Sequence, residues 1–381
     1  MSEYIVIGTI IAAFAVAAVL SYFFTPPVKN FAHKVGAIDV PKDARRMHKK
    51  PIPRLGGLAI YGGFLCSILI FGQLDETMLC VLLGAAIIVA LGIFDDVLAL
   101  GAKLKFVVQI VAAAIPVCIG DLQIGLFTNL NPLSDTPFVH LGILAVPVTI
   151  IWIVGITNAV NLIDGLDGLA VGVSSIAAIT MLAVALLTGN MPIAITMAAL
   201  AGACIGFMPY NLNPAKIFMG DTGSTFLGYM LATVSIMGLF KFYAVISFAV
   251  PFLILGLPIF DTAFAMIRRM AHGQSPMHAD RSHIHHRLID MGLNQKQAVA
   301  TLYVISAILG LSAVVLTTSG EGRAMLLFLV LCIVAVVAAR VVFPKEVKEE
   351  LHEELEELKE HGHHGHHPAD KPEDDGKTEE K

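Results

Sequence analysis

Long apolar runs recur along almost the whole chain, and they limit the fold more than any other feature of the sequence. A helix that crosses a bilayer needs about 20 mostly apolar residues. About eleven runs of roughly that length fall at 4–24, 57–74, 77–94, 104–120, 138–156, 169–188, 191–210, 225–240, 243–266, 300–317 and 323–343. Because 56% of the 381 residues are hydrophobic and only 14% are charged, a soluble globular protein is excluded. We predict an all-α protein, a polytopic membrane bundle of about eleven transmembrane helices.

The distribution of basic residues predicts which way this bundle faces. The first run, 4–24, lacks a basic leading segment and a convincing cleavage site, so we expect a retained helix and not a signal peptide. Alternate loops then share one side, and these loops are 25–56, 95–103, 157–168, 211–224, 267–299 and the C-terminal tail. They hold nearly all the Lys and Arg residues, whereas the other side keeps only Lys241 and Arg323. Since positive loops stay in the cytoplasm, we expect the N-terminus outside and the C-terminus cytoplasmic.

The tail differs in composition from the rest of the chain. Residues 344–381 are highly charged and include the cluster His361-Gly-His-His-Gly-His-His367. We predict a transmembrane domain at 1–343 with cytoplasmic catalytic loops, followed by a disordered cytoplasmic tail. Weak binding of Zn²⁺ or Ni²⁺ by the histidines is the alternative, although glycine-spaced histidines define no rigid site.

A polar stretch follows the fifth apolar run. Asn158, Asn161, Asp164 and Asp167 recur at every third position, so in a helical turn they would share a face. Such polarity at the mouth of an apolar segment is unfavourable unless it pairs or coordinates with something. The simpler alternative is a well-capped loop between helices.

Two further acidic motifs lie on the same predicted side. Asp95 and Asp96 end the third run, where adjacent carboxylates are disfavoured by the helix dipole and by each other. A cation would offset them, or one of them would act as a base. Lys105 follows closely, either as a phosphate ligand or as an ordinary membrane-surface anchor. Asp221 stands between glycines at the start of the eighth run, as a metal ligand or a helix cap.

Basic and titratable residues concentrate in the last cytoplasmic loop. These residues are Arg281, His283, His285, His286 and Arg287. Zinc binding is one interpretation, but no nearby partner completes a site. Recognition of a sugar or a diphosphate fits the mixture of histidine and arginine better. Asp261, inside the ninth run, is expected to pair with a neighbour or to face the polar cavity.

Together these residues predict a divalent-metal site for a phosphorylated or diphosphate substrate beside the lipid bilayer. The motifs resemble those of the polyprenyl-phosphate N-acetylhexosamine-1-phosphate transferases. The matching stretches, in chain order, are Pro53-Arg-Leu-Gly-Gly57, Asp95-Asp-Val-Leu-Ala-Leu100, Asn158-Ala-Val-Asn-Leu-Ile-Asp-Gly-Leu-Asp-Gly-Leu169, Phe218-Met-Gly-Asp-Thr-Gly-Ser224 and Asp280-Arg-Ser-His-Ile-His-His-Arg287. Each motif is modest alone, and their order and topology make the resemblance specific.

The resemblance implies roles for these residues. Members transfer a sugar-1-phosphate from a UDP-sugar to undecaprenyl phosphate, release UMP and need Mg²⁺ or Mn²⁺. By the resemblance Asn161 and Asp221 bind the metal, and Asp95 and Asp96 activate the lipid phosphate or assist the metal. The expected substrate-binding residues are Lys105, Asn158, Asp164, Asp167, Arg281, His283, His285, His286 and Arg287. A multi-pass protein of the bacterial inner (plasma) membrane with a cytoplasmic active site is implied, a homodimer is compatible with the family, and no nucleic-acid partner is expected.

The histidine loop separates branches of that family. Lipid I-forming phospho-N-acetylmuramoyl-pentapeptide transferases have an uninterrupted His-His-His, whereas this chain reads His283-Ile-His-His286. That pattern is similar to the branch that uses UDP-N-acetylglucosamine, at the first membrane step of cell-envelope polysaccharide or teichoic acid synthesis. The pentapeptide transferase stays open as an alternative. From another class, an ion-coupled transporter predicts polar residues at the bilayer midplane, and a metal-handling protein predicts that deletion of the tail abolishes function.

Overall fold

The protein is described by a computed structural model that covers residues 3–41, 51–128, 138–238, 244–271 and 283–318. Its helices are α1 (Glu3–Val35), α2 (Gly57–Phe71), α3 (Glu76–Leu98), α4 (Ala102–Cys118), α5 (Ala145–Leu162), α6 (Leu169–Leu187), α7 (Met191–Asn211), α8 (Gly220–Gly238), α9 (Ala244–Ile254), α10 (Gly256–Ala271), α11 (Ile284–Asp290) and α12 (Gln295–Thr318). A short 3₁₀ helix, η1 (Gly142–Leu144), precedes α5. The predicted all-α class is confirmed.

Two short antiparallel strand pairs complete the described part of the chain. β1 (Ile38–Asp39) pairs with β2 (Ile52–Pro53), with Ile38 opposite Pro53. β3 (Leu126–Thr128) pairs with β4 (Phe138–His140), with Phe127 opposite Val139. These pairs join helices and do not form a separate sheet layer.

Several helices have the length and composition of membrane spans. Six of the described helical segments qualify, at Tyr4–Val35, Glu76–Leu98, Gly142–Leu162, Leu169–Leu187, Met191–Asn211 and Gln295–Thr318. The chain is therefore a multi-pass membrane protein. The predicted total of about eleven spans and the orientation of the termini stay predictions, and the last predicted run at 323–343 and the tail at 344–381 lie outside the described residues.

The structure divides the ninth apolar run and adds a helix that the sequence did not predict. The run forms α9 and α10, which are separate on either side of Leu255. Pro258 has no N–H to donate to Ile254, so the first helix ends there and the proline lies in the first turn of the next one. α11 falls within the stretch 267–299, which was predicted to be a loop.

α8 is enclosed by the other helices and sets the position of the acidic motif at its N-terminus. It packs against α2, α3, α5 and α6, and almost all of its residues are buried. α8 lies close to α2 and α3 because glycines stand at the contacts between these helices. A Cβ atom on Gly57 would lie 2.1 Å from the Cα of Gly223, and one on Gly92 would lie 2.4 Å from the Cα of Thr222.

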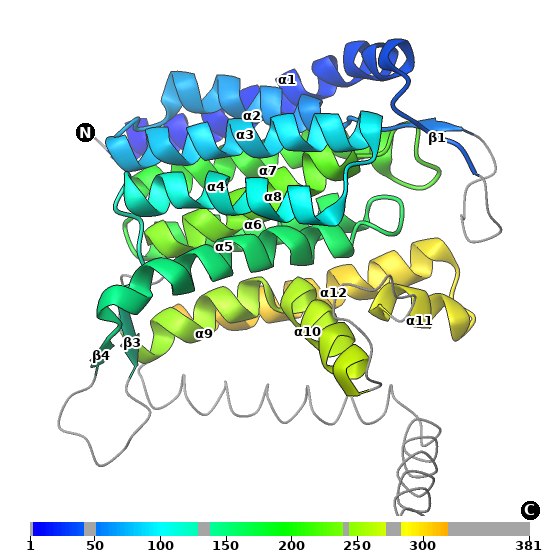
Figure 1. Cartoon of the computed structure of the whole chain (residues 1–381). Helices are drawn as coiled ribbons and strands as arrows, with labels where there is room; N and C mark the ends of the chain where they lie inside the picture. Colours follow the sequence, from blue (N-terminus) through cyan, green and yellow to red (C-terminus); the bar gives the residue numbers. More distant parts are fainter. Residues whose placement is uncertain (1–2, 42–50, 129–137, 239–243, 272–282, 319–381) are drawn as a thin grey trace, which may run out of the picture. The chain divides into compact units, whose positions relative to one another are not determined.

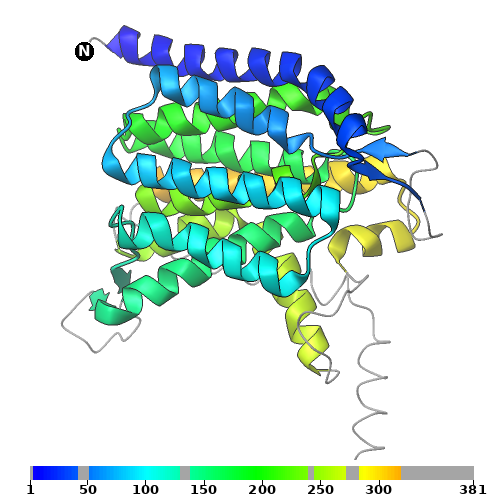
Figure 2. The same cartoon turned by 45° about the horizontal axis from the view of Figure 1, so that its top comes forward.

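The connections that were predicted to be cytoplasmic gather at one end of the bundle. In Figures 1 and 2 the loops after α3, α5 and α7 lie at the end marked by β1 and α11, opposite the end marked by β3 and β4. The helices alternate in direction, so every second connection returns to that end. The polar motifs therefore meet although long apolar helices separate them in the chain.

Candidate active site

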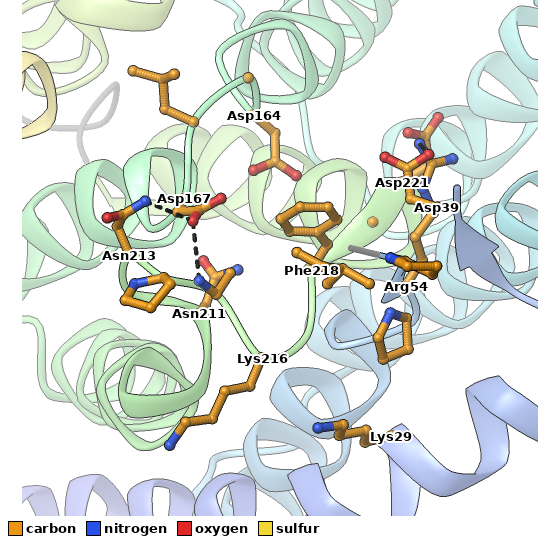
Figure 3. Close-up of a pocket in the computed structure, with 18 of the residues that line it drawn as sticks. Lys29, Asp39, Arg54, Asp164, Asp167, Asn211, Asn213, Lys216, Phe218 and Asp221 are labelled. Carbon is orange, nitrogen blue, oxygen red and sulfur yellow. Dashed lines mark hydrogen bonds and ion pairs between the residues drawn. The ribbon is translucent and has the colours of Figure 1, made fainter. Parts of the chain in front are cut away.

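A cavity of about 790 Å³ opens among these connections (Figure 3). Five of the predicted site residues line it, namely Asn161, Asp164, Asp167, Asp221 and His286. Figure 3 shows the carboxylates of Asp164 and Asp167 on one side and the ammonium groups of Lys29 and Lys216 on the opposite side. A ligand with phosphate groups that shares the cavity with a cation matches this division of charge.

An ammonium group joins two of the acidic motifs beside the cavity. The Nζ atom of Lys105 lies 2.9 Å from Oδ2 of Asp95 and 3.0 Å from Oδ2 of Asp221. The other oxygen of Asp95 accepts a hydrogen bond from the N–H of Leu100 at 2.8 Å. Lys105 thus holds the carboxylates of Asp95 and Asp221 next to each other. Two carboxylates so close together favour a bound cation.

The same cluster fits the predicted divalent metal. The amide of Asn161 lies close enough to Asp221 to stabilise its carboxylate, and it donates to Oγ of Ser224 at 2.8 Å, so the two predicted metal ligands are neighbours. Among the described residues no group of three His, Cys, Asp or Glu side chains could hold a metal alone. Mg²⁺ is usually held by one or two carboxylates together with water and substrate phosphates, so a site that is completed by the substrate suits this arrangement.

Asp96 has different surroundings from Asp95. Its carboxylate is 8% exposed, and it accepts hydrogen bonds from the N–H groups of Asp221 and Thr222, both at 3.0 Å. The hydroxyl of Thr222 donates a third bond at 2.7 Å. These are the free N–H groups of the first turn of α8, so Asp96 caps that helix from the neighbouring α3.

The acidic stretch 158–168 begins in the last turn of α5 and continues as a tight loop. Oδ2 of Asp167 accepts hydrogen bonds from the side-chain amide of Asn213 at 2.9 Å and from the N–H of Ala215 at 3.0 Å. Asp164 is half-buried at the cavity. Burial raises the pKa of Asp164 to about 8, and the negative charges of Asp221 and Asp96 act in the same direction.

Asn158 lies apart from the cavity wall. Its side-chain amide donates to Oε1 of Gln109 at 2.7 Å and to the carbonyl of Val154 at 2.8 Å. Gln109 is 3% exposed, so the pair is a polar contact between α5 and α4. Its predicted role in substrate binding stays a prediction.

The histidine motif is tied to α10 by a buried hydrogen bond. Nδ1 of His283 lies 2.9 Å from Oδ2 of Asp261, and the other oxygen of Asp261 accepts from the N–H of Ile284 at 2.8 Å. The expectation that Asp261 pairs with a neighbour is thus confirmed. His285 is buried, and burial, with His286 and His283 nearby, lowers its pKa to about 3.

The remaining members of the motif differ in position. His286 lines the cavity. The guanidinium of Arg287 lies 6.0 Å from the ring centre of Phe264, and neither side chain is part of the cavity wall. Arg281 lies outside the described residues.

The structure adds cavity residues that sequence reasoning missed. They are Lys29, His33, Asn213, Lys216 and Gln295. The first two belong to a basic segment that the positive-inside rule already explained, so nothing singled them out. Asn213 precedes Pro214 in a polar turn between two motifs. This Asn-Pro turn is the feature of the sequence that could have pointed to a functional loop.

Comparison with known proteins places this geometry in a family. The family model of glycosyl transferase family 4 matches residues 78–239. A Bacillus subtilis protein named probable undecaprenyl-phosphate N-acetylglucosaminyl 1-phosphate transferase is 43% identical over 333 residues, which cover 87% of this chain and 92% of that protein. A decaprenyl-phosphate N-acetylglucosaminephosphotransferase of Mycolicibacterium smegmatis is 34% identical, with 84% of this chain and 85% of that protein covered.

A second branch of the family also matches this chain. A phospho-N-acetylmuramoyl-pentapeptide-transferase of Clostridium beijerinckii is 30% identical over 317 residues, which cover 80% of this chain and 94% of that protein. The matches confirm the predicted resemblance and its N-acetylglucosaminyl 1-phosphate transferase branch. The chain belongs to glycosyl transferase family 4.

Proposed function

We propose that this enzyme transfers N-acetylglucosamine-1-phosphate from UDP-N-acetylglucosamine to undecaprenyl phosphate and releases UMP. The observation that carries the proposal is the ammonium group of Lys105 between Asp95 and Asp221, beside a cavity that Asn161 and Asp164 also line. The name of the 43% identical relative supports the same acceptor and the same transferred group.

The transfer is proposed as a direct displacement. An oxygen of the lipid phosphate forms a bond to the sugar-bearing phosphorus, and the bond from that phosphorus to the UMP oxygen breaks. Lys105 contacts the diphosphate, and Asp95 keeps the lipid phosphate deprotonated or orients it. Asn161 and Asp221 would hold Mg²⁺ or Mn²⁺, whose charge neutralises the diphosphate as UMP leaves. Asp164, Asp167 and His286 face the nucleotide-sugar.

The membrane sets where the two substrates meet. The lipid acceptor enters from the inner leaflet, and the soluble donor enters the cavity from the cytoplasm. The proposed enzyme therefore belongs to the bacterial inner (plasma) membrane and has its active site on the cytoplasmic face, and the distribution of basic residues supports this orientation. The expected homodimer belongs to the proposal through the family resemblance alone.

A donor comparison tests the proposal. Purified enzyme with undecaprenyl phosphate and Mg²⁺ should release UMP and form the lipid-linked sugar from UDP-N-acetylglucosamine. Turnover with UDP-N-acetylmuramoyl-pentapeptide alone would retain the chemistry and overturn the donor. If folded protein uses neither donor nor any other UDP-sugar, the transferase proposal is wrong and an ion-coupled transporter takes its place.

A further inference from the structure

We propose that α11 and α12 hold the acidic loop at residues 163–168 in its working position, and that Tyr303 of α12 is a positioning residue for Asp164 and Asp167. The inference rests on the proposed function, because it assigns the donor to this loop. None of the sequence motifs includes Tyr303.

The hydroxyl of Tyr303 fixes the end of the loop. It donates to the carbonyl oxygen of Gly168 at 2.5 Å. That carbonyl already accepts the N–H of Gly172 at 3.0 Å, within the first turn of α6. The carbonyl of Gly168 therefore has a hydrogen-bond partner even without Tyr303. The additional bond from Tyr303 connects α12 to the residue that directly follows Asp167.

Close packing holds the tyrosine ring at this place. A Cβ atom on Gly172 would lie 2.0 Å from the Tyr303 hydroxyl oxygen and 2.1 Å from its Cζ atom. The ring thus occupies the space that any larger side chain at Gly172 would need. Gly168 has a φ of +81°, in the region that favours glycine, so the loop turns sharply at the atom that the tyrosine holds.

A second contact comes from α11 and reaches the middle of the loop. A Cβ atom on Gly165 would lie 2.2 Å from Nε2 of His285. The ring of His285 is 2% exposed and stacks on His283 with 5.8 Å between ring centres. His283 is in turn bound to Asp261. The loop therefore rests on His285, which is anchored to α10 through the buried hydrogen bond between His283 and Asp261.

A third contact starts from the first residue of α12. Oε1 of Gln295 accepts a hydrogen bond from the side-chain amide of Asn213 at 2.6 Å, and the same amide donates to Asp167 at 2.9 Å. The three contacts reach Gly165, Asp167 and Gly168, so they restrain the loop at successive points. Because Asp164 and Asp167 are carried by this loop, loosening it should weaken donor binding more than acceptor binding.

The first test removes one hydroxyl and compares it with a matched control. Tyr303→Phe keeps the ring and deletes the bond to Gly168. Tyr229→Phe deletes a similar bond, from a buried tyrosine of α8 to the carbonyl of Val81 at 3.2 Å, away from the loop. Two readouts are compared, amide hydrogen exchange at 163–168 and steady-state kinetics.

The expected results differ between these two variants. In Tyr303→Phe the loop amides exchange faster and the KM for the UDP-sugar rises, each by about 3- to 10-fold, while the KM for undecaprenyl phosphate is unchanged. Tyr229→Phe changes neither quantity. Wild-type exchange and wild-type KM values in Tyr303→Phe would overturn the proposal.

The second test examines the contact of His285 with the loop through paired substitutions. Gly165→Ala places a methyl group against the histidine ring, and His285→Ala removes the ring. We expect each single variant to lose affinity for the donor, and the loss in the double variant to be smaller than the sum of the two single losses. Additive effects would exclude the contact.

Hydrogen exchange separates this inference from the proposed function. Faster loop exchange in Tyr303→Phe, combined with no turnover of any UDP-sugar by the wild type, would support the positioning contact and contradict the transferase. Normal turnover by the wild type, combined with unchanged loop exchange in Tyr303→Phe, would support the transferase and contradict the positioning contact.

Discussion

At the scale of single residues, Asp95 and Asp96 show how two adjacent carboxylates acquire separate tasks. Asp95 meets Lys105 and Asp221, whereas both oxygens of Asp96 accept hydrogen bonds from the first turn of α8. From the sequence both residues were given one role, because a motif does not show which of two adjacent side chains faces the substrate. In a helix, neighbouring side chains point in directions about 100° apart, so their surroundings differ. We therefore propose that Asp95 contacts the acceptor phosphate and that Asp96 positions Asp221.

Substitution by asparagine should separate these tasks. Asp96→Asn turns a donor amide toward the N–H groups of α8, so the free energy of unfolding should fall by about 1–3 kcal/mol. Asp95→Asn removes a charge close to Asp221, so stability should be kept while turnover falls about 100-fold or more. Thermal unfolding in detergent and UMP release provide the two measurements. Equal loss of stability in both variants, or nearly full activity of Asp95→Asn, would contradict the assignment.

The buried His285 predicts a pH dependence of stability. Burial, with His286 and His283 beside it, lowers its pKa to about 3, against the opposing charge of Asp261. In the unfolded chain the pKa is 6.5, so protonation favours unfolding. The contribution is present above pH 6.5 and is lost progressively as the pH falls toward 3. At pH 5 the loss relative to pH 7.5 should be about 2 kcal/mol.

His285→Gln removes this titration and provides the comparison. Unfolding midpoints of both proteins are measured between pH 7.5 and pH 5. We expect the wild type to lose more stability than the variant over this range, by the amount given above. Parallel curves would show that His285 does not titrate as its burial requires.

At the scale of elements, the sequence predicts the helices better than it predicts their contacts. Runs of apolar residues locate α6 and α7 to within a residue or two, because a bilayer requires a minimum helix length. Such helices are hydrophobic all round, so periodicity does not show which face meets which neighbour. Asn158, for example, was grouped with Asn161, Asp164 and Asp167 by its spacing, and the structure adds that its side chain contacts Gln109 of α4. The contact of Tyr303 with Gly168, across 135 positions of the chain, has no local sign at all.

The glycine contacts of α8 give a prediction about this element. A methyl group at Gly92 would collide with Thr222, next to Asp221. Gly92→Ala should therefore shift the start of α8, lower the unfolding temperature and raise the Mg²⁺ concentration needed for half-maximal UMP release. Gly155 of α5 has no atom within 4 Å of the corresponding position, so Gly155→Ala is the control and should change neither property. Unchanged metal dependence in Gly92→Ala would show that this packing does not set the position of Asp221.

At the scale of the whole molecule, the alternating helices collect polar residues from distant parts of the chain at one end of an apolar bundle. The cavity wall takes residues from Lys29 near the start of the chain to Gln295 at the start of α12. This order of motifs and the side they share could be predicted from the sequence, because both follow from counting spans. The position of the polar residues at one end favours chemistry on a membrane face over transport through the midplane.

The most direct test of the account is the metal dependence of UMP release by the wild type and by Asp221→Ala. Asp75→Asn is the matched control, since Asp75 caps α3 through the N–H of Met78 at 2.8 Å and is not part of the cavity wall. We expect Mg²⁺-dependent turnover in the wild type and in Asp75→Asn, and its loss in folded Asp221→Ala. Turnover that is independent of metal, or that persists in Asp221→Ala with unchanged metal dependence, would contradict this expectation.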